Sequence, residues 1–218
     1  MSGVEGGDTV ITLDGPAASG KSSVAERVAR RLGVPFVSSG LLYRAAAWVV
    51  GGMGADPDDE AAVLALLKAR RARLEPSTAG DRVWVDASDV TDELHTDGVD
   101  AIVSTVARHP RVRAWVRDRL REIPGSFVID GRDMGTVVFP EARFKFYLTA
   151  PVEVRAKRRV GERSADLEAV AEAIRRRDRL DARQLAPAED AVHIDTGPMT
   201  LDEVVDAVMR SLSGVGAP

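Results

Sequence analysis

Short apolar runs alternate along the chain with longer segments of helical period. The runs show little internal alternation, which is typical of parallel strands that are covered by helices on both faces. They are residues 10–13, 35–37, 127–129, 144–148 and 191–194. The pattern predicts an α/β fold, a three-layer α/β/α sandwich around a five-stranded parallel sheet.

Three helices belong to this core pattern. The first is expected at residues 22–32, where apolar side chains repeat every four positions and Gly33 supplies a left-handed C-cap. Two more are expected at residues 97–108 and 110–121, the last with Pro110 in its first turn.

Two segments depart from the core pattern. A short helix at residues 60–69 and an alternating strand at 82–86 predict a small inserted subdomain, and the Arg-rich helices of residues 152–183 are interpreted as a mobile lid. We therefore expect a single domain, residues 1–218. Its parts are a core of about 8–50, 99–151 and 184–212, an insertion of about 51–98 and a lid of about 152–183.

Composition narrows the classes of function. The 218 residues are 44% hydrophobic, carry a net charge of -4 and include no cysteine. A globular protein without a basic surplus is not expected to bind nucleic acid or an anionic membrane, and no disulfide can form. His95, His109 and His193 lack metal-ligand spacing, so no protein-held metal site is expected of them. We predict a cytoplasmic monomer acting on small molecules.

The most specific motif follows the first strand. Residues 15–22 fit G-x-x-x-x-G-K-[ST] between an apolar run and a helical pattern, the context that this phosphate-binding loop requires. Backbone N–H groups of the loop and of the helix N-terminus would hold the triphosphate, Lys21 would reach the β- and γ-phosphates, and Ser22 would ligate Mg²⁺. The predicted nucleotide-binding residues are Gly15, Pro16, Ala17, Ala18, Ser19, Gly20, Lys21, Ser22 and Ser23.

A second set of polar residues follows other strands. Ser39 and Arg44 come directly after the strand at 35–37, at the sheet edge where open α/β folds bind ligands. A hydroxyl at a helix N-terminus with an arginine about one helical turn later predicts a phosphate pocket. A helix cap and a surface arginine are the alternative interpretation.

The strand at 127–129 ends in a charged segment, Asp130-Gly131-Arg132-Asp133. Charges at a buried strand end are costly unless they bind something. Arg132 is expected to hold an acceptor phosphate, Asp130 to approach Mg²⁺ through water, and Asp133 to accept from an exocyclic amine or a ribose hydroxyl. The alternative is an internal network of salt bridges.

Taken together, the motifs resemble those of the bacterial cytidylate kinases, which are P-loop nucleoside monophosphate kinases. The resemblance runs from about residue 10 to 208. It rests on ITLDGPAASGKSS, SSGLLYR, HPRVR, DGRDMGTVVFP, KFYLTA and RRDRLD, of which DGRDMGTVVFP is the most specific. It implies a P-loop kinase fold in which the insertion binds the monophosphate and the lid closes on ATP.

The resemblance also implies roles for single residues. The ligands of the acceptor phosphate would be Ser39, Arg44 and Arg132. The readers of the cytosine would be Ser104, Arg113 and Asp133. Arg177 and Asp181 would hold the ribose and phosphate of CMP, and the lid arginines beside ATP would be Arg155, Arg158 and Arg159. In many relatives an arginine lies three residues beyond the aspartate that Asp181 matches, whereas here Arg183 lies two beyond it.

The expected reaction is Mg²⁺-dependent transfer of the ATP γ-phosphoryl group to CMP or dCMP, in pyrimidine nucleotide metabolism. Its catalytic residues would be Lys21, Asp130, Arg132 and Arg158. Three alternatives stay open at this point: a kinase for UMP, AMP or shikimate, a P-loop switch whose output is a partner interaction, and a structural protein with an inactive loop. The intact Gly20-Lys21-Ser22 and the lack of an N-K-x-D motif disfavour the last two.

Overall fold

The computed structural model describes residues 8–161, 166–182 and 184–214. Its contacts divide the chain into two compact units, Met1–Val34 with Ser126–Pro218 and Pro35–Gly125. The central sheet is five-stranded with the order β2-β6-β1-β7-β8, so the predicted α/β fold is confirmed. In the described part of the chain, no helix is both long and apolar enough to cross a membrane.

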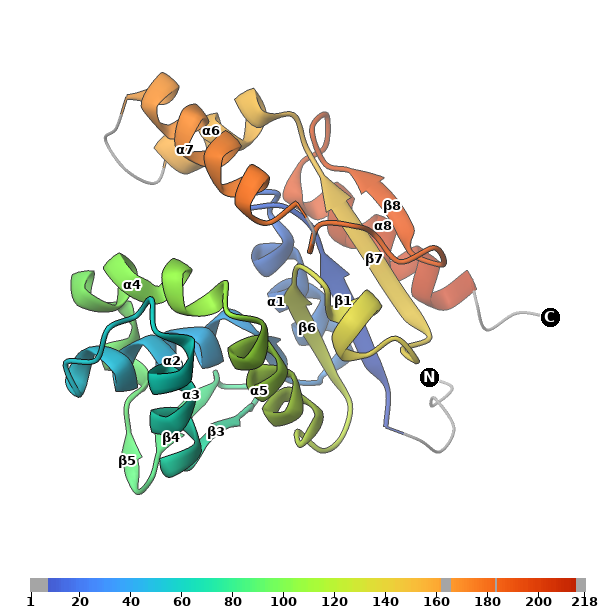
Figure 1. The fold of residues 1–218 in the computed structure, drawn as a ribbon. Coiled ribbons are helices and arrows are strands. Elements are labelled where there is room, and N and C mark those ends of the chain that lie inside the picture. Colours follow the sequence, from blue (N-terminus) through green and yellow to red (C-terminus); the bar gives the residue numbers. More distant parts are fainter. Residues whose placement is uncertain (1–7, 162–165, 183, 215–218) are drawn as a thin grey trace. The chain divides into compact units, whose positions relative to one another are not determined.

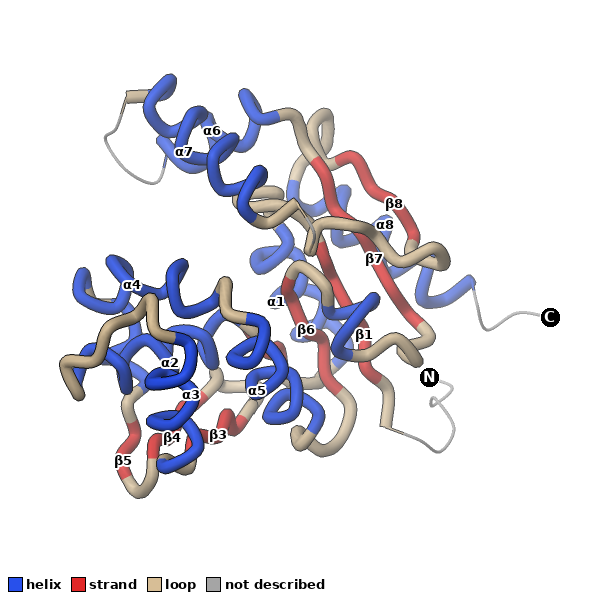
Figure 2. Tube along the Cα trace, in the orientation of Figure 1, coloured by secondary structure: helices blue, strands red, loops and turns tan. Residues whose placement is uncertain are grey.

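The first unit holds four of the sheet strands and the helices around them (Figures 1 and 2). Its elements are β1 (Val10–Asp14), α1 (Lys21–Leu32), β6 (Phe127–Gly131), the π-helical turn η2 (Met134–Val138), β7 (Phe144–Thr149), α6 (Val152–Gly161), α7 (Leu167–Leu180), β8 (Val192–Asp195) and α8 (Leu201–Gly214). β1 pairs in parallel with β6 on one side and with β7 on the other, and β7 pairs with β8.

Parallel pairing brings the carboxyl ends of these strands to one edge of the sheet. In the register, Asp14 at the end of β1 lies beside Gly131 on β6 and Tyr147 on β7. Strands β1, β6 and β7 are mostly buried, whereas β8 is mostly exposed, and helices α1 and α8 pack together. Loops that leave this edge therefore start from a rigid frame, which is the usual place for a ligand site in this class of sheet.

The second unit is a helical group around a small antiparallel sheet. Its elements are β2 (Phe36–Ser38), α2 (Gly40–Gly52), α3 (Glu60–Ala69), β3 (Ala72–Glu75), β4 (Arg82–Val85), β5 (Ser88–Asp89), the 3₁₀ turn η1 (Thr91–His95), α4 (Asp97–Ala107) and α5 (Pro110–Arg121). β4 is the central strand, with β3 on one side and β5 on the other. Helix α2 packs against α4, α3, β3, β4 and η1.

The boundaries of this unit differ from the expected insertion at 51–98. Helices α2, α4 and α5 were expected in the core. They group with the insertion instead, because α2 packs against the helices and strands of the insertion. β3 was not predicted either, although Ala72 and Leu74 are buried and alternate with more exposed residues, as a half-buried strand requires.

Candidate active site

The phosphate loop runs from the end of β1 to the start of α1, and two of its glycines are needed for their backbone geometry. Gly15 has φ +151°, and a Cβ there would lie 2.2 Å from the carbonyl oxygen of Leu148. Gly20 has φ +90° and caps α1 without a side chain. Only glycine suits both positions, so the first loop residue can pack against β7 and the last can open the helix toward an anion.

Lys21 and Ser22 stand at the first turn of α1, beside the end of β6. The Ser22 hydroxyl donates a hydrogen bond to the Asp130 carboxylate, which is only 4% exposed. Burial lowers the pKa of Lys21, and so do the charges of Arg132 and Arg177, whereas Asp130 raises it. The structure thus places the predicted Mg²⁺ residues together, next to the lysine expected to contact the phosphates.

This oxygen pair fits a magnesium ion. Mg²⁺ prefers hard oxygen ligands and is usually held by one or two protein groups plus substrate phosphates. The Ser22 hydroxyl and the Asp130 carboxylate supply such oxygens at the anion-binding end of α1. Among the described residues no cluster of three or more His, Cys, Asp or Glu could hold a metal alone, so the remaining ligands would come from a nucleotide and water.

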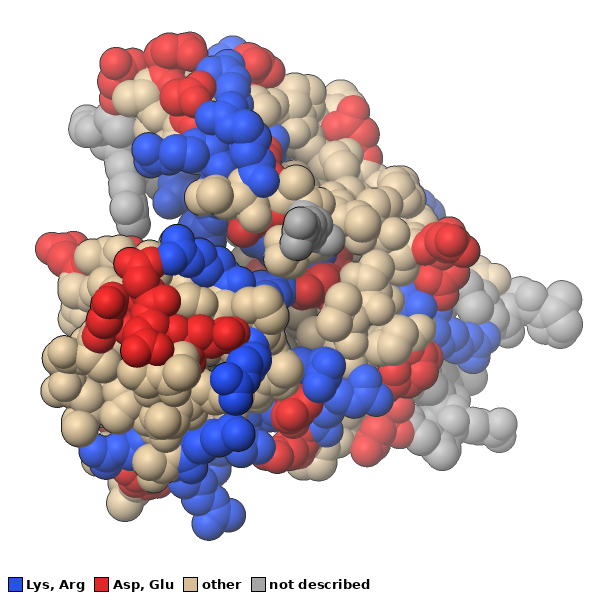
Figure 3. Space-filling model, in the orientation of Figure 1, with Lys and Arg blue, Asp and Glu red and all other residues tan. Residues whose placement is uncertain are grey.

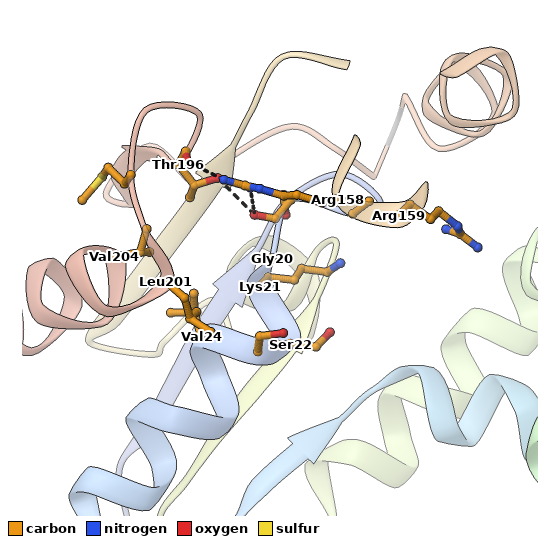
Figure 4. Close-up of a pocket in the computed structure, with 13 residues that line it drawn as sticks. Gly20, Lys21, Ser22, Val24, Arg158, Arg159, Thr196, Leu201 and Val204 are labelled. Atoms are coloured by element: carbon orange, nitrogen blue, oxygen red, sulfur yellow. Dashed lines mark hydrogen bonds between the residues drawn. The ribbon is translucent and has the colours of Figure 1, made fainter. Parts of the chain in front are cut away.

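A cavity of about 560 Å³ opens beside the loop (Figure 4). Its lining residues are Ala18, Ser19, Gly20, Lys21, Ser22, Ser23, Val24, Arg158, Arg159, Thr196, Met199, Leu201 and Val204. One end of the cavity is polar and lies at the N-terminus of α1, where phosphate groups could bind. The other end is apolar and is formed by Val24, Leu201 and Val204. This division suits a nucleotide, whose phosphates are anionic and whose base is flat and largely apolar on its faces.

Arg158 reaches across the mouth of this cavity from α6 to the end of β8. Its Nη1 donates to the Thr196 hydroxyl at 2.9 Å, and its Nη2 donates to the Thr196 carbonyl at 2.6 Å. Arg159 also lines the cavity but points away from Thr196 (Figure 4). More basic side chains gather over α6 and α7 (Figure 3), so the predicted lid presents positive charge.

Arg155, by contrast, is not among the residues that line the cavity. It is 4% exposed and pairs with Asp178 on α7, with Nη2 and Oδ2 2.6 Å apart. Its other donors go to the carbonyl oxygens of Ala17 at 3.0 Å and Ala150 at 2.9 Å. Ala18 also packs on the small apolar core between α6 and α7. Arg155 therefore ties the base of the lid to the phosphate loop.

Three residues predicted to bind the acceptor, Arg132, Arg177 and Asp181, form one cluster of ion pairs. Nη1 of Arg132 is 3.0 Å from Oδ2 of Asp181, and Nε of Arg177 is 3.7 Å from the same oxygen. Asp133 is buried at the N-terminus of η2. This cluster joins the end of β6 to the end of α7, as the assigned roles require of groups that meet one small ligand.

Two further residues at this sheet edge were not predicted from the sequence. Asp14 accepts hydrogen bonds from the backbone N–H groups of Met134 at 2.9 Å and Gly135 at 2.7 Å. The Thr196 hydroxyl donates toward the carbonyl oxygens of Ser19 at 3.1 Å and Thr149 at 3.0 Å. Asp14 ends the apolar strand β1 with a polar side chain, which is the signal that had marked Asp130, so the same rule could have found it. Thr196 lies one residue beyond the end of β8.

The other predicted acceptor residues, Ser39, Arg44, Ser104 and Arg113, belong to the second unit. Arg44 donates to the Leu94 carbonyl at 2.8 Å and lies 2.8 Å from the Asp100 carboxylate. Arg113 on α5 stacks over Tyr43, with its guanidinium carbon 5.4 Å from the ring centre. The remaining two are Ser39, buried at the N-cap of α2, and Ser104, exposed on α4. Arg183 lies outside the described residues.

The family model for cytidylate kinase matches residues 11–213. The chain belongs to this family. It is 58% identical over 203 residues to the cytidylate kinase of Thermus thermophilus, covering 93% of this chain and 98% of the relative. It is 56% identical to the cytidylate kinase of Deinococcus deserti, also over 203 residues, 93% of this chain and 98% of that relative. The predicted family, and with it a P-loop kinase that binds nucleotides, is confirmed.

Solved structures support the fold independently. A gluconokinase from Sinorhizobium meliloti is similar with a TM-score of 0.51 and 16% identity, over 95% of this chain and 93% of that one. A likeness at this level of identity concerns the fold alone. The phosphoryl acceptor must therefore be argued from the family and from the residues of the site.

Proposed function

We propose that this protein is a cytidylate kinase that transfers the γ-phosphoryl group of ATP to the 5′-phosphate of CMP or dCMP. The observation that carries the proposal is the juxtaposition of Lys21, Ser22 and Asp130 at the phosphate loop of a chain matched along 11–213 by the family. The cavity beside the loop is the proposed place of the ATP base and ribose.

The proposed reaction needs positioning and charge neutralisation rather than a protein base. The acceptor is an anionic phosphate oxygen, which can attack without losing a proton to the enzyme. Lys21 and the backbone N–H groups of the loop would hold the donor phosphates, and Arg132 would hold the acceptor phosphate. When bound, Mg²⁺ would be held by Ser22 and Asp130 and would neutralise charge on the donor phosphates.

Cytosine recognition is assigned to Ser104, Arg113 and Asp133, with Arg177 and Asp181 at the ribose. The ion pair between Arg132 and Asp181 supports the assignment of Asp181, because it brings together residues that follow β6 and α7. Ser39 and Arg44 would complete the phosphate site. The monomeric state, the cytoplasmic location and the absence of nucleic-acid and membrane partners stay predictions.

The proposal is tested by ADP release from Mg-ATP with CMP, dCMP, UMP, AMP and GMP offered separately, beside a control without acceptor. We expect fast turnover with CMP and dCMP only. Fast turnover with another monophosphate would support the assignment as a kinase but refute the assignment of the cytosine-binding residues. Slow hydrolysis that does not depend on an acceptor would favour a P-loop switch instead.

Lys21→Ala separates catalysis by this site from a contaminating activity. Loss of a charge that stabilises the transferring group is expected to lower kcat by about 100-fold or more. Lys68→Ala is the matched control, because Lys68 is exposed on α3 and belongs to none of the assigned sites. Full turnover by Lys21→Ala would contradict the assignment.

A further inference from the structure

We propose that Asp14 is a positioning residue for the phosphoryl acceptor: its carboxylate clasps the backbone of η2 and so fixes the segment that carries Arg132 and Asp133. The inference rests on the proposed function, in which these two residues bind the acceptor. It adds a residue outside the predicted nucleotide-binding set, one that links the end of β1, where the phosphate loop begins, to the segment that carries Arg132 and Asp133.

The clasp meets two donors that η2 itself cannot satisfy. The first N–H groups of any helical turn lack partners within that turn. In η2 these are the N–H groups of Met134 and Gly135, and each donates to a different oxygen of Asp14, at 2.9 and 2.7 Å. Asp14 is only 6% exposed, so water does not compete freely for these bonds.

Close packing sets the turn directly on β1. A Cβ on Gly135 would lie 2.8 Å from the Thr12 hydroxyl oxygen, and one on Gly131 would lie 2.5 Å from Cγ of Met134. The chain thus folds back sharply after Gly131, with Arg132 and Asp133 at the bend. Because both ends of the bend are fixed to β1, the orientation of these two side chains depends on the clasp.

The clasp is made for a carboxylate, which accepts through both oxygens. An asparagine has the same shape but only one accepting oxygen. Its NH₂ group would face the second backbone N–H, so that two donors would oppose each other. Protonation of Asp14 likewise turns one of the two accepting oxygens into a donor. The ionisable groups around it are Asp133 at η2, Lys21 on α1 and Tyr147 on β7.

The test compares steady-state kinetics of wild type and Asp14→Asn, using whichever monophosphate the wild-type enzyme phosphorylates fastest. The test of the clasp then does not depend on whether cytosine is the correct base. Loss of a hydrogen bond to a charged acceptor predicts that KM for the acceptor rises about tenfold or more, while KM for ATP stays within about twofold. Equal changes in both KM values, or no change, would overturn the proposal.

Gly135→Ala perturbs the same clasp from the other side, since its Cβ must push η2 away from Thr12. It is expected to reproduce the selective rise in the acceptor KM. The matched control is Asp59→Asn, because Asp59 also accepts two backbone N–H bonds, at 2.9 and 3.0 Å, but at the exposed N-cap of α3. A selective acceptor effect in the control would show that the clasp is not responsible.

The pH profile separates positioning from a general loss of stability. In wild type, kcat/KM for the acceptor should fall below a pH of about 6, where Asp14 takes up a proton. The acceptor phosphate also titrates at about pH 6. That ionisation is common to both enzymes, so the ratio of wild type to Asp14→Asn isolates Asp14. A ratio that is constant with pH would refute the role.

Discussion

The buried carboxyl of Asp14 makes a sharp prediction for the pH dependence of folding stability. Burial raises its pKa from 3.8 to about 6, even though the N–H groups of Met134 and Gly135 and the charge of Lys21 oppose the rise. A folded-state pKa above the unfolded value means that the native state takes up the proton first. The contribution to stability is therefore largest at acid pH and is lost as the pH rises through about 6.

The size of the effect follows from the two pKa values. The shift from 3.8 to about 6 amounts to about 3 kcal/mol at high pH, where Asp14 is ionised in both states. The loss is about 3 kcal/mol at pH 7 and about 2 kcal/mol at pH 5. Acidification from pH 7 to pH 5 should thus return about 1 kcal/mol of stability, which corresponds to roughly 2–4 °C in Tm for a chain of this size.

The measurement is the free energy of unfolding of wild type and Asp14→Asn, by urea denaturation at pH 7, 6 and 5. All other groups titrate in both proteins, so the difference between them isolates Asp14. The free energy of unfolding of Asp14→Asn relative to wild type should decrease by about 1 kcal/mol from pH 7 to pH 5. A difference that does not vary with pH would refute the assigned burial cost. A carbon NMR titration of the Asp14 carboxyl, expected near 6, checks the same value directly.

The destabilisation caused by the buried Asp14 carboxylate indicates that the clasp has a role other than fold stability. A residue kept only for packing would be better uncharged in a buried position. Asp14→Asn is therefore expected to retain most of the stability at neutral pH while it loses affinity for the acceptor. A variant that is well folded but binds the acceptor poorly is the combination that a purely structural role does not predict.

The parts of this protein that the sequence predicted are those specified by local pattern. Apolar runs without alternation marked the sheet strands, and the glycines and Lys21 of the phosphate loop follow β1 without interruption. Asp130 and Ser22 were predicted to share a metal, and they do meet, because parallel pairing of β1 and β6 brings both strand ends to one edge. The contact with the metal itself stays a prediction.

The parts that were missed depend on partners far apart in the chain. Asp14 meets Met134 across 120 positions. Its place at a strand end marks Asp14 as a candidate, but no local pattern identifies Met134 as its partner. Arg155 was expected beside ATP from the family resemblance, and in the structure it pairs in the interior with Asp178, two residues before the end of α7. A sequence shows that an arginine is present but not which carboxylate it will find.

Two further substitutions test how the phosphate loop is supported. Gly15→Ala would place a Cβ 2.2 Å from the Leu148 carbonyl at φ +151°, so we expect a loss of roughly 2–4 kcal/mol and weaker ATP binding. Gly52→Ala is the control, because a Cβ at this position would meet open space and should not destabilise the protein. Equal Tm values for the two variants would contradict the clash expected at Gly15. Arg155→Met would leave Asp178 without its buried partner and should cost about 3 kcal/mol in unfolding by urea. Because a lone buried carboxylate causes much of that loss, adding Asp178→Leu should recover part of it. If the double variant were as unstable as the sum of both single ones, Arg155 would act through the loop carbonyls and not through the ion pair.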